Sequence, residues 1–247
     1  MLNPDYILHI CADKDSLDQA CAAYWLEQAR EAITQRGVFH VALTGGATPQ
    51  ALYRLLASPH YAQQIDWSGV HIYIGDERYV PHDHTDSNFG MTRVCLLDHV
   101  AIPAAILHPI PTDEQQATEA ARRYAVELQQ NISVNAAGFP QLDLIMLGMG
   151  DDGHTASLFP GTDILIVADR SVAATYVDKL AAWRVSMTYP TLNAARQIML
   201  MVSGDNKSAI LAHVLTKDST HVYPIQGVHN DGEFHCFIDQ AAAGGLA

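Results

Sequence analysis

The sequence predicts a predominantly parallel α/β sandwich folded as a single domain. Short apolar runs, which are typical of buried strands, alternate with helical patterns from one end of the chain to the other. Hydrophobic residues make up 49% of the 247 residues and charged residues 17%, the profile of a globular protein with an ample core. No low-complexity linker or internal repeat divides the chain. We therefore expect residues 1–247 to form one three-layer domain around a mainly parallel sheet.

The first elements are read from the spacing of their apolar side chains. Residues 6–12 are predicted to form an opening strand, and a helix is predicted over 13–35, where residues such as Leu17 and Trp25 recur at helical spacing. Gly37 is expected to end this helix. By the same reasoning, further strands are predicted at 39–43, 70–75, 106–108, 142–147, 184–188, 197–202 and 233–238, with one or two more between 163 and 177.

The other helices are placed by their start signals and by their position between strands. Pro49 suits the first position of a helix, and Thr112 with Gln115 matches the spacing of a capping box. The predicted helices begin at Pro49 and at Thr112, the latter ending near residue 131, and also cover 88–97, 190–195 and 208–215.

Charge and cysteine content limit the possible partners. The net charge of −13 argues against a nucleic acid or an acidic membrane, although a local group of Arg and Lys can still bind a small anion. Cys11, Cys21, Cys95 and Cys236 are scattered, so we expect four reduced, buried thiols. The sequence starts without a basic leader segment, and none of its apolar runs approaches about 18 residues. We expect a cytosolic protein that is a monomer or a weak homo-oligomer.

The strongest functional signal follows the apolar run 142–147. The turn Gly148-Met-Gly-Asp-Asp-Gly-His154 lets the chain bend sharply at the carboxyl end of a strand, where open α/β sheets bind their ligands. Asp151, Asp152 and His154 place two carboxylates and an imidazole within four residues. That density of titratable groups predicts an active site. The structural alternative is a turn whose Asp residues only cap the next helix.

A second turn, Thr44-Gly-Gly-Ala-Thr-Pro49, follows the predicted strand 39–43. Gly45 and Gly46 allow backbone N–H groups to approach a ligand closely, and Thr48 is expected to cap the following helix. The helix end carries roughly half a positive charge, so the turn suits a phosphate. An ordinary capped strand-to-helix turn is the alternative. The turn is not a Walker A loop, because no Gly-Lys-Ser/Thr follows.

Two cations also stand at predicted strand ends. Arg78 closes the sequence Gly75-Asp-Glu-Arg78 and can bind a phosphate or a sugar carboxylate with two hydrogen bonds. An ion-pair cluster at the rim is the alternative. Lys207 stands at the start of a predicted helix, an end that favours anions over cations. A bound anion would explain this placement, and a solvated surface lysine is the alternative.

Two apparent cofactor sites are not expected to function. His82 and His84 lie two residues apart in a polar loop, a spacing that matches no zinc motif. A literal G-x-G-x-x-G begins at Gly148, but only about ten residues separate it from the strand-like run 164–169, too few for a crossover helix. The acids inside the motif would also repel a pyrophosphate. We therefore expect no metal and no cofactor.

Five motifs, taken together and in this order, resemble the 6-phosphogluconolactonases. They are Thr44-Gly-Gly-Ala-Thr-Pro49, Gly75-Asp-Glu-Arg78, Ser87-Asn88, Gly148-Met-Gly-Asp-Asp-Gly-His-Thr-Ala-Ser-Leu-Phe-Pro160 and Gly204-Asp-Asn-Lys207. The resemblance implies a Rossmann-like α/β fold shared with glucosamine-6-phosphate deaminases and ribose-5-phosphate isomerases. Asp-Glu-Arg and Thr-Ala-Ser-Leu-Phe-Pro favour the lactonase, because the deaminase typically has Asp-Glu-Tyr and a different continuation.

The resemblance also implies roles for individual residues. His154 would be the base that activates water for hydrolysis of 6-phosphogluconolactone to 6-phosphogluconate, and Asp152 would orient it. Among the phosphate-binding cations Arg78 is the first candidate and Arg184 the last. The implied site residues are His154 and Asp152 for catalysis and Thr44, Gly45, Gly46, Thr48, Arg78, Arg184 and Lys207 for the phosphate.

One residue departs from the family pattern, and two other functions stay open. Ala47 stands where the family usually has Ser, which removes a hydroxyl donor and predicts weaker phosphate binding by about 1 kcal/mol. The first alternative function is a glucosamine-6-phosphate deaminase or isomerase. The second is a sugar-phosphate sensor without catalysis.

Overall fold

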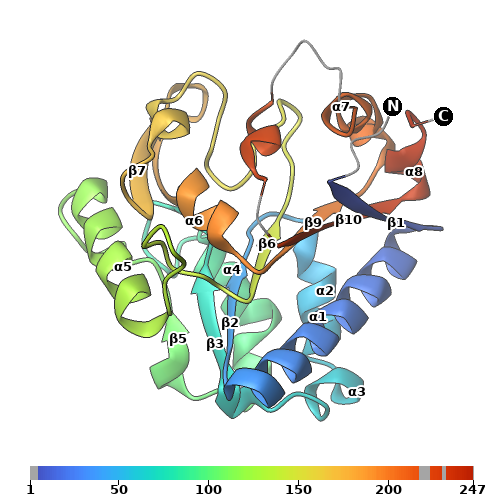
Figure 1. The fold of residues 1–247 in the computed structure, drawn as a ribbon, viewed down its shortest axis with the longest axis horizontal. Coiled ribbons are helices and arrows are strands. Elements are labelled where there is room, and N and C mark those ends of the chain that lie inside the picture. Colours follow the sequence, from blue (N-terminus) through green and yellow to red (C-terminus); the bar gives the residue numbers. More distant parts are fainter. Residues whose placement is uncertain (1–4, 217–222, 230–231, 247) are drawn as a thin grey trace.

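The computed structural model describes residues 5–216, 223–229 and 232–246. Its main sheet is parallel throughout, which confirms the predicted α/β architecture (Figure 1). The strands follow the spatial order β1 (Tyr6–Cys11), β10 (Glu233–Asp239), β9 (Gln197–Val202), β6 (Leu144–Leu147), β2 (Phe39–Leu43), β3 (Val70–Ile74) and β5 (Leu107–His108).

β6 is the middle strand of this sheet, as its apolar run predicts. Each of its four side chains is at most 1% exposed, because the strand is covered on both faces. Neighbouring β9 pairs with it over its full length, and β2 pairs with it on the other side. The turn that follows β6 therefore starts from the buried centre of the main sheet.

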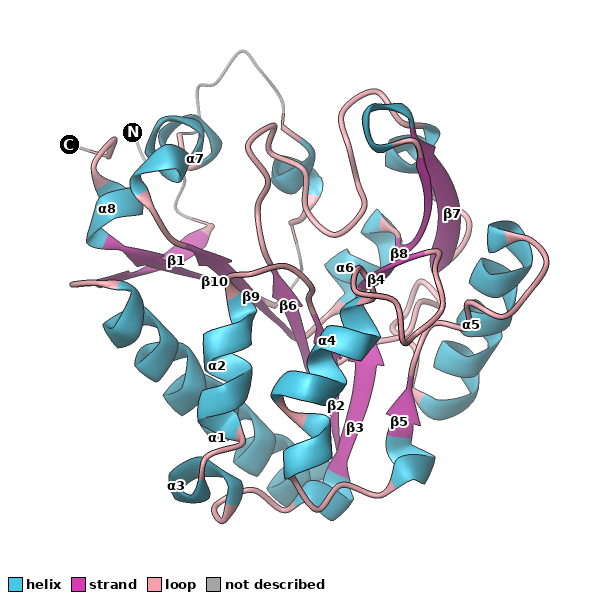
Figure 2. Ribbon diagram, turned by 180° about the vertical axis from the view of Figure 1, so that it is seen from behind, coloured by secondary structure: helices cyan, strands magenta, loops and turns pink. Residues whose placement is uncertain are grey.

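Helices flank the main sheet on both sides. Figure 2 shows α2 and α4 in front of the strands, and Figure 1, drawn from the opposite side, shows α6 in front of them. The helices are α1 (Lys14–Arg36), α2 (Pro49–Leu56), α3 (Pro59–Ala62), α4 (Asn88–Cys95), α5 (Ala117–Asn131), α6 (Tyr189–Ala194), α7 (Ser208–Val214) and α8 (Gln240–Ala243).

Capping interactions fix both ends of α1. The Asp13 side chain accepts a hydrogen bond of 2.8 Å from the Ser16 backbone N–H, which satisfies one of the free donors at the helix start. Gly37 ends the helix with a φ of 77°, and its N–H donates to the Ile33 carbonyl. The predicted end of this helix is confirmed.

A second sheet, which the sequence did not predict, stands beside the first. It is antiparallel, with the order β4 (Asp76–Arg78), β8 (Ala182–Met187) and β7 (Val172–Val177). Gly75 links the two sheets, because its N–H donates to the Leu43 carbonyl and its carbonyl accepts from Met187 N–H, both at 2.9 Å. Residues 76–78 therefore form a strand of their own rather than the end of β3.

The start of one predicted helix is wrong. The helix predicted from Thr112 begins at Ala117, because the preceding segment forms an irregular connection held by a hydrogen bond from the Tyr79 hydroxyl to the Glu114 carbonyl. Of the one or two strands predicted between 163 and 177, one forms, β7, and the strand-like run at 164–169 forms none. Its first residues belong to a 3-10 helix, Asp163–Ile166, in which Ile164 alone is buried.

All four cysteines are free thiols, as predicted, but their burial differs. Cys21, Cys95 and Cys236 are buried, while Cys11 is only partly covered. Cys11 is the exception because it lies on β1, the edge strand of the main sheet, which has a neighbour on one side only.

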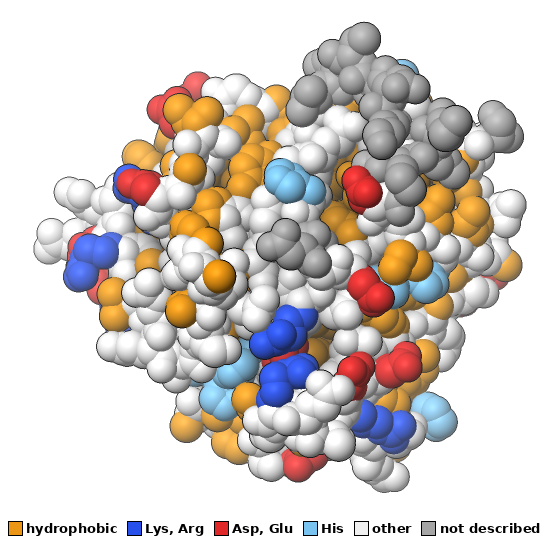
Figure 3. All heavy atoms as spheres, viewed as in Figure 1, with side chains coloured by type: hydrophobic (Ala, Val, Ile, Leu, Met, Phe, Trp, Pro, Cys, Tyr) orange, Lys and Arg blue, Asp and Glu red, His pale blue; other side chains and the backbone are white. Residues whose placement is uncertain are grey.

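Two further features concern possible binding to membranes and nucleic acids. None of the helices in the described ranges combines the length and the apolar character that a bilayer crossing needs. On the face drawn in Figure 3, Lys and Arg side chains form small separate groups among acidic, apolar and neutral side chains.

A cluster of histidines lies across β2, β3 and β5. The His71 and His108 rings approach to 3.0 Å between Nδ1 and Nε2, and His108 Nδ1 lies 2.8 Å from the Glu127 carboxylate. His40 lies 5.1 Å from the His71 ring and 3.3 Å from the Tyr73 hydroxyl. Burial, together with the neighbouring imidazoles, lowers the pKa of His40 to about 4.

This cluster predicts a loss of stability in mild acid. The folded state holds His40 neutral, while the same residue in the unfolded chain takes up a proton near pH 6.5. The contribution of neutral His40 to the free energy of unfolding is therefore complete above about pH 6.5 and is lost as the pH falls toward 4. Urea unfolding of wild type and His40→Gln over this range should show a flatter pH dependence in the variant. The exposed His60→Gln serves as the control, and parallel curves for wild type and His40→Gln would contradict the expectation.

Candidate active site

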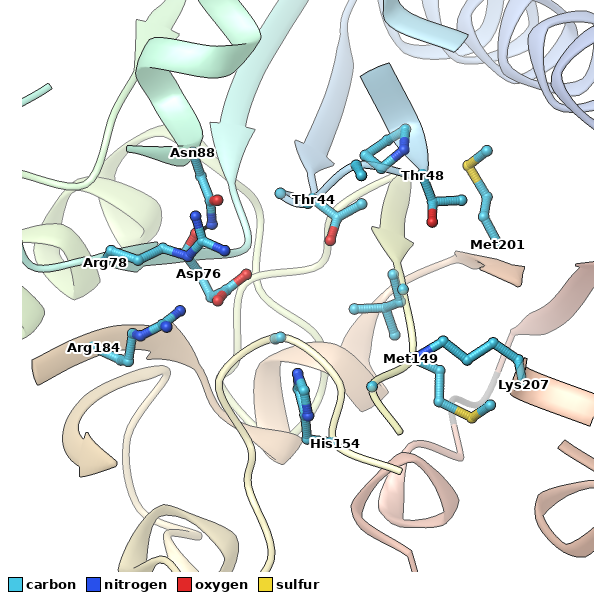
Figure 4. A pocket seen from close by; sticks show the side chains of 18 residues that line it. Thr44, Thr48, Asp76, Arg78, Asn88, Met149, His154, Arg184, Met201 and Lys207 are labelled. Carbon is cyan, nitrogen blue, oxygen red and sulfur yellow. Dashed lines mark hydrogen bonds between the residues drawn. The ribbon is translucent and has the colours of Figure 1, made fainter. Parts of the chain in front are cut away.

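A cleft of about 240 Å³ opens where the strands of the main sheet end. Its walls come from the turn after β2, from β4 and β8 of the second sheet, and from the turns after β6 and β9 (Figure 4). The cleft brings together every predicted site residue except Asp152, which stands directly behind one of them. The lining members of the predicted set are Thr44, Gly45, Gly46, Thr48, Arg78, His154, Arg184 and Lys207.

The turn after β2 presents unpaired backbone donors to this cleft. The Tyr53 hydroxyl accepts from the Thr44 N–H at 3.0 Å and donates to the Thr44 carbonyl at 2.8 Å, which fixes the start of the turn. Among the described residues, none accepts a hydrogen bond from the N–H groups of residues 45–48. Four unpaired N–H groups in a turn that leads into a helix suit an anion with several oxygens.

Thr48 does not play the predicted capping role. Its backbone is already helical, with φ −58° and ψ −48°, and its side chain makes no capping hydrogen bond. The hydroxyl instead belongs to the wall of the cleft, as Figure 4 shows. The turn is held from behind by Lys14, whose Nζ donates to the Thr48 carbonyl at 3.3 Å.

His154 and Asp152 form a hydrogen-bonded pair in the turn after β6. The Nδ1 atom of the imidazole lies 2.5 Å from Asp152 Oδ1, so Nδ1 carries the proton that the carboxylate accepts. No described residue bonds to Nε2, and the ring reaches into the cleft (Figure 4). Phe159 stacks on the ring with 4.0 Å between centroids. The free lone pair of Nε2 therefore faces the cavity.

The electrostatics of the pair keep the imidazole neutral. Burial lowers the pKa of His154 below its ordinary value, and it outweighs the opposing effect of Asp152. Burial acts to raise the pKa of Asp152, but hydrogen bonds from Lys179 and His154 outweigh it and lower that pKa to about 2. At neutral pH the site therefore contains a neutral imidazole and an ionised carboxylate, the state needed to accept a proton.

The second sheet adds two arginines to the cleft. Arg78 of β4 pairs in register with Arg184 of β8, so their side chains emerge together. The Arg78 side chain donates to the Asp86 carbonyl at 2.6 Å, whereas the Arg184 side chain makes neither a hydrogen bond nor an ion pair with any described residue. The Nε atoms of both are buried without a partner. Two such donors in one cleft indicate an anionic ligand.

Lys207 reaches the cleft from the turn after β9. Its Nζ forms an ion pair with Asp151, whose side chain is 77% exposed, while the Lys207 side chain is 19% exposed. Asp151 therefore does not cap a helix. It neutralises a cation at the rim of the cleft, and an entering anion would have to replace it.

Sequence reasoning missed two residues of the cleft wall. Asp76 is buried and accepts a hydrogen bond of 2.7 Å from Ser157 Oγ. Asn88 donates to the Asp76 carbonyl at 2.7 Å, and its Oδ1 is buried without a partner. Both belong to quoted motifs, but a motif alone does not show which of its side chains faces the ligand.

Glu77, between Asp76 and Arg78, has a structural role. Its buried carboxylate accepts hydrogen bonds from the N–H groups of Asn88 at 2.7 Å and Phe89 at 2.8 Å, and from the Ser87 hydroxyl at 3.0 Å. A carboxylate at a helix start is stabilised by these donors. Glu77 thus fixes the first residues of α4, including Asn88, against the second sheet.

Close packing in the turn after β6 makes glycine necessary at position 150. A Cβ atom added there would lie 2.0 Å from the His154 ring, far inside van der Waals contact. The Gly150 N–H also donates to the His154 carbonyl at 2.9 Å. The main chain of the turn therefore runs directly along the imidazole and sets its position.

We predict that Gly150→Ala displaces His154 and lowers kcat by at least ~100-fold, the range of a lost general base. Gly244→Ala is the control, because Gly244 lies outside the cleft, its φ of −56° suits alanine, and an added methyl group meets no atom closer than 3.5 Å. The control should retain kcat within about threefold, which corresponds to less than 1 kcal/mol. Circular dichroism would establish that both variants are folded, and equal kcat values for the two would contradict the packing argument.

Comparisons with known proteins confirm the resemblance in sequence. The family model for glucosamine-6-phosphate isomerases/6-phosphogluconolactonase matches residues 12–236. A 6-phosphogluconolactonase of Nostoc sp. is 42% identical over 217 residues, which cover 87% of this chain and 88% of that protein. The one of Haemophilus influenzae is 34% identical over 205 residues, with coverage of 82% and 85%.

The fold comparison extends over the full chain. The solved structure of 6-phosphogluconolactonase from Trypanosoma brucei has a TM-score of 0.89, is 25% identical in sequence, and covers 100% of both chains. Sequence and structure thus point to the same group of proteins. The chain belongs to the glucosamine-6-phosphate isomerase/6-phosphogluconolactonase family.

Proposed function

We propose that this protein hydrolyses 6-phosphogluconolactone to 6-phosphogluconate, a step of the oxidative pentose phosphate pathway. The observation that carries the proposal is the single cleft that joins a neutral, carboxylate-held imidazole to a group of unpaired anion donors. Relatives 42% and 34% identical bear the name of this lactonase, which favours it over a deaminase or a sensor without catalysis. The enzyme is a carboxylic-ester hydrolase.

The chemistry needs a water, a base and cations for the substrate. In the proposed mechanism His154 Nε2 takes a proton from water as the water attacks the lactone carbonyl, and later returns it to the departing ring oxygen. Asp152 holds the imidazole in the required tautomer and stabilises its cation. A lactone is an activated ester, so no covalent intermediate and no cofactor enter the scheme.

The phosphate of the substrate would lie on the turn after β2. Thr44, Gly45, Gly46 and Thr48 surround it, and the unpaired N–H groups of residues 45–48 supply its donors. These donors support binding even though Ala47 offers no hydroxyl. Cationic partners would be the three cleft cations, Arg78, Arg184 and Lys207.

The wider setting of the enzyme follows from the same features. A small sugar phosphate lactone is the proposed partner, since a net charge of −13 disfavours nucleic acid. We propose that residues 1–247 act as one lactonase domain in the cytosol, as a monomer or a weak homo-oligomer.

The first test measures acid release in a pH-stat, with 6-phosphogluconolactone generated in place and its spontaneous hydrolysis subtracted. Wild type should release acid well above background, and His154→Ala should lose at least ~100-fold in kcat, because its base is gone. The exposed His60→Ala should behave as wild type. Wild-type release at the background rate would refute the lactonase assignment, and ammonia release from glucosamine 6-phosphate would then identify the alternative.

The second test separates binding from chemistry at the rim of the cleft. Lys207→Met should raise KM by ~10-fold with little change in kcat, because a charged hydrogen bond to the phosphate is lost. Asp151→Asn should lower KM by ~2- to 5-fold, since Lys207 no longer has to leave an ion pair. Steady-state kinetics measure both. A rise of KM in Asp151→Asn would show that the ion pair assists binding.

A further inference from the structure

Lys179 contacts the catalytic pair from a separate part of the chain. It lies in the turn between β7 and β8, in the short 3-10 helix Asp178–Leu180. Its Nζ donates a hydrogen bond to Asp152 Oδ2, while Asp152 Oδ1 accepts a hydrogen bond from Nδ1 of His154. Both oxygens of one carboxylate are thus occupied by a cation on one side and the imidazole on the other.

A second contact ties Lys179 to the same imidazole. Its Nζ lies 4.8 Å from the centre of the Phe159 ring, within the range of a cation–π interaction. Phe159 is buried and stacks on His154. Lys179 therefore acts on both groups that fix the imidazole plane, namely the carboxylate at its Nδ1 edge and the aromatic ring on its face.

The turn that carries Lys179 is a tight turn closed by a hydrogen bond of the main chain. Ala181 closes it with a φ of 47°, in the left-handed region that alanine rarely adopts, and its N–H donates to the Asp178 carbonyl at 3.0 Å. Lys179 itself does not line the cleft. Its side chain is 52% exposed, yet its ammonium is directed to Asp152 rather than to solvent alone.

We propose that Lys179 is a positioning residue of the reaction: it anchors the Asp152 carboxylate, and through it His154, to the hairpin of the second sheet. The proposal rests on the proposed function, in which His154 is the base. Without Lys179 the carboxylate is held at Oδ1 alone, where it accepts from the Nδ1–H and the backbone N–H of His154, and Oδ2 loses its anchor. The segment after β6 then loses its tie to the β7–β8 turn, while the hydrogen bond from Ser157 to Asp76 of β4 remains.

The proposal has a consequence for the charge state of the site. The charged groups that act on His154 are Asp152 from its own turn, Asp76 from β4 and Lys179 from the hairpin. Both acids raise the pKa of the imidazole, and Lys179 lowers it. Loss of the Lys179 charge therefore raises the pKa of His154, and more of the base is protonated, hence inactive, in mildly acidic solution.

The test compares pH profiles of kcat for wild type, Lys179→Met, Lys179→Gln and Lys179→Arg. Both neutral variants should lose ~10-fold in kcat near pH 6.5 and regain part of it at higher pH, with KM within about twofold of wild type. Lys179→Arg should restore most of the activity because it keeps the cation. Arg170→Met is the matched control, since Arg170 is an exposed cation paired only with its neighbour Asp169.

NMR titration of the imidazole gives a readout that does not depend on turnover. The His154 signal is assigned by its loss in His154→Ala, and its titration should move to higher pH in Lys179→Met but not in Arg170→Met. Superimposable kcat profiles or titrations for wild type and both neutral variants would overturn the proposal. A rise in KM at unchanged kcat would also overturn it, because Lys179 would then bind substrate.

The two assignments fail separately. If His154→Ala keeps its turnover, the assignment of His154 as the base is wrong, whatever the Lys179 variants show. If His154→Ala loses turnover while the folded Lys179 variants match wild type, the base stands and only the positioning role is refuted.

Discussion

The pairing of β4 with β8 is the contact on which the rest of the site depends. The main sheet alone brings together the turns after β2, β6 and β9, but it supplies no arginine to the cleft. The chain leaves that sheet at Gly75, and the register of the second sheet then places Arg78 opposite Arg184. The hairpin of β7 and β8 in the same sheet carries Lys179 to the turn after β6. The second sheet therefore supplies three of the cations near His154, two from the β4–β8 pairing and one from this hairpin.

The charges near the cleft show how an acidic protein can favour an anion. With a net charge of −13, the field of the whole molecule repels a phosphate. Near the cleft, however, Asp151 and Asp152 are each paired with a lysine, and Glu77 is enclosed by donors at the start of α4. With these acids engaged, the unpaired donors among the described residues of the cleft include the two guanidinium Nε atoms and the N–H groups of the glycine turn.

The sequence predicted the parts of the site whose signal lies in consecutive residues. The turns at 44–49 and 148–154 carry their glycines and polar groups side by side, so both the bends and the exposed functional groups could be inferred. Strand bounds such as 39–43 and 197–202 agree with the structure because apolar runs of five or six residues have a clear pattern. The glycine at 150, which gives His154 its room, belongs to the same local signal.

The parts that were missed depend on contacts between distant residues. β4 has only three residues, too few for any periodicity, and its strand character comes from β8 about a hundred positions away. For that reason Arg184 was ranked last among the cations, although the register sets it beside Arg78. Lys179 was overlooked because a single lysine in a turn carries no local pattern. The helix predicted from Thr112 fails similarly, because a tertiary hydrogen bond holds the preceding segment irregular.

The most direct measurement is a crystal structure of the protein with bound 6-phosphogluconate. The account predicts that the phosphate lies on the N–H groups of residues 45–48 and that the C1 carboxylate lies within about 3.2 Å, or one water, of His154 Nε2. A product whose carboxylate lies away from His154 while its phosphate occupies the turn would contradict the assignment of the base. A phosphate bound outside the cleft would contradict the account of the site as a whole.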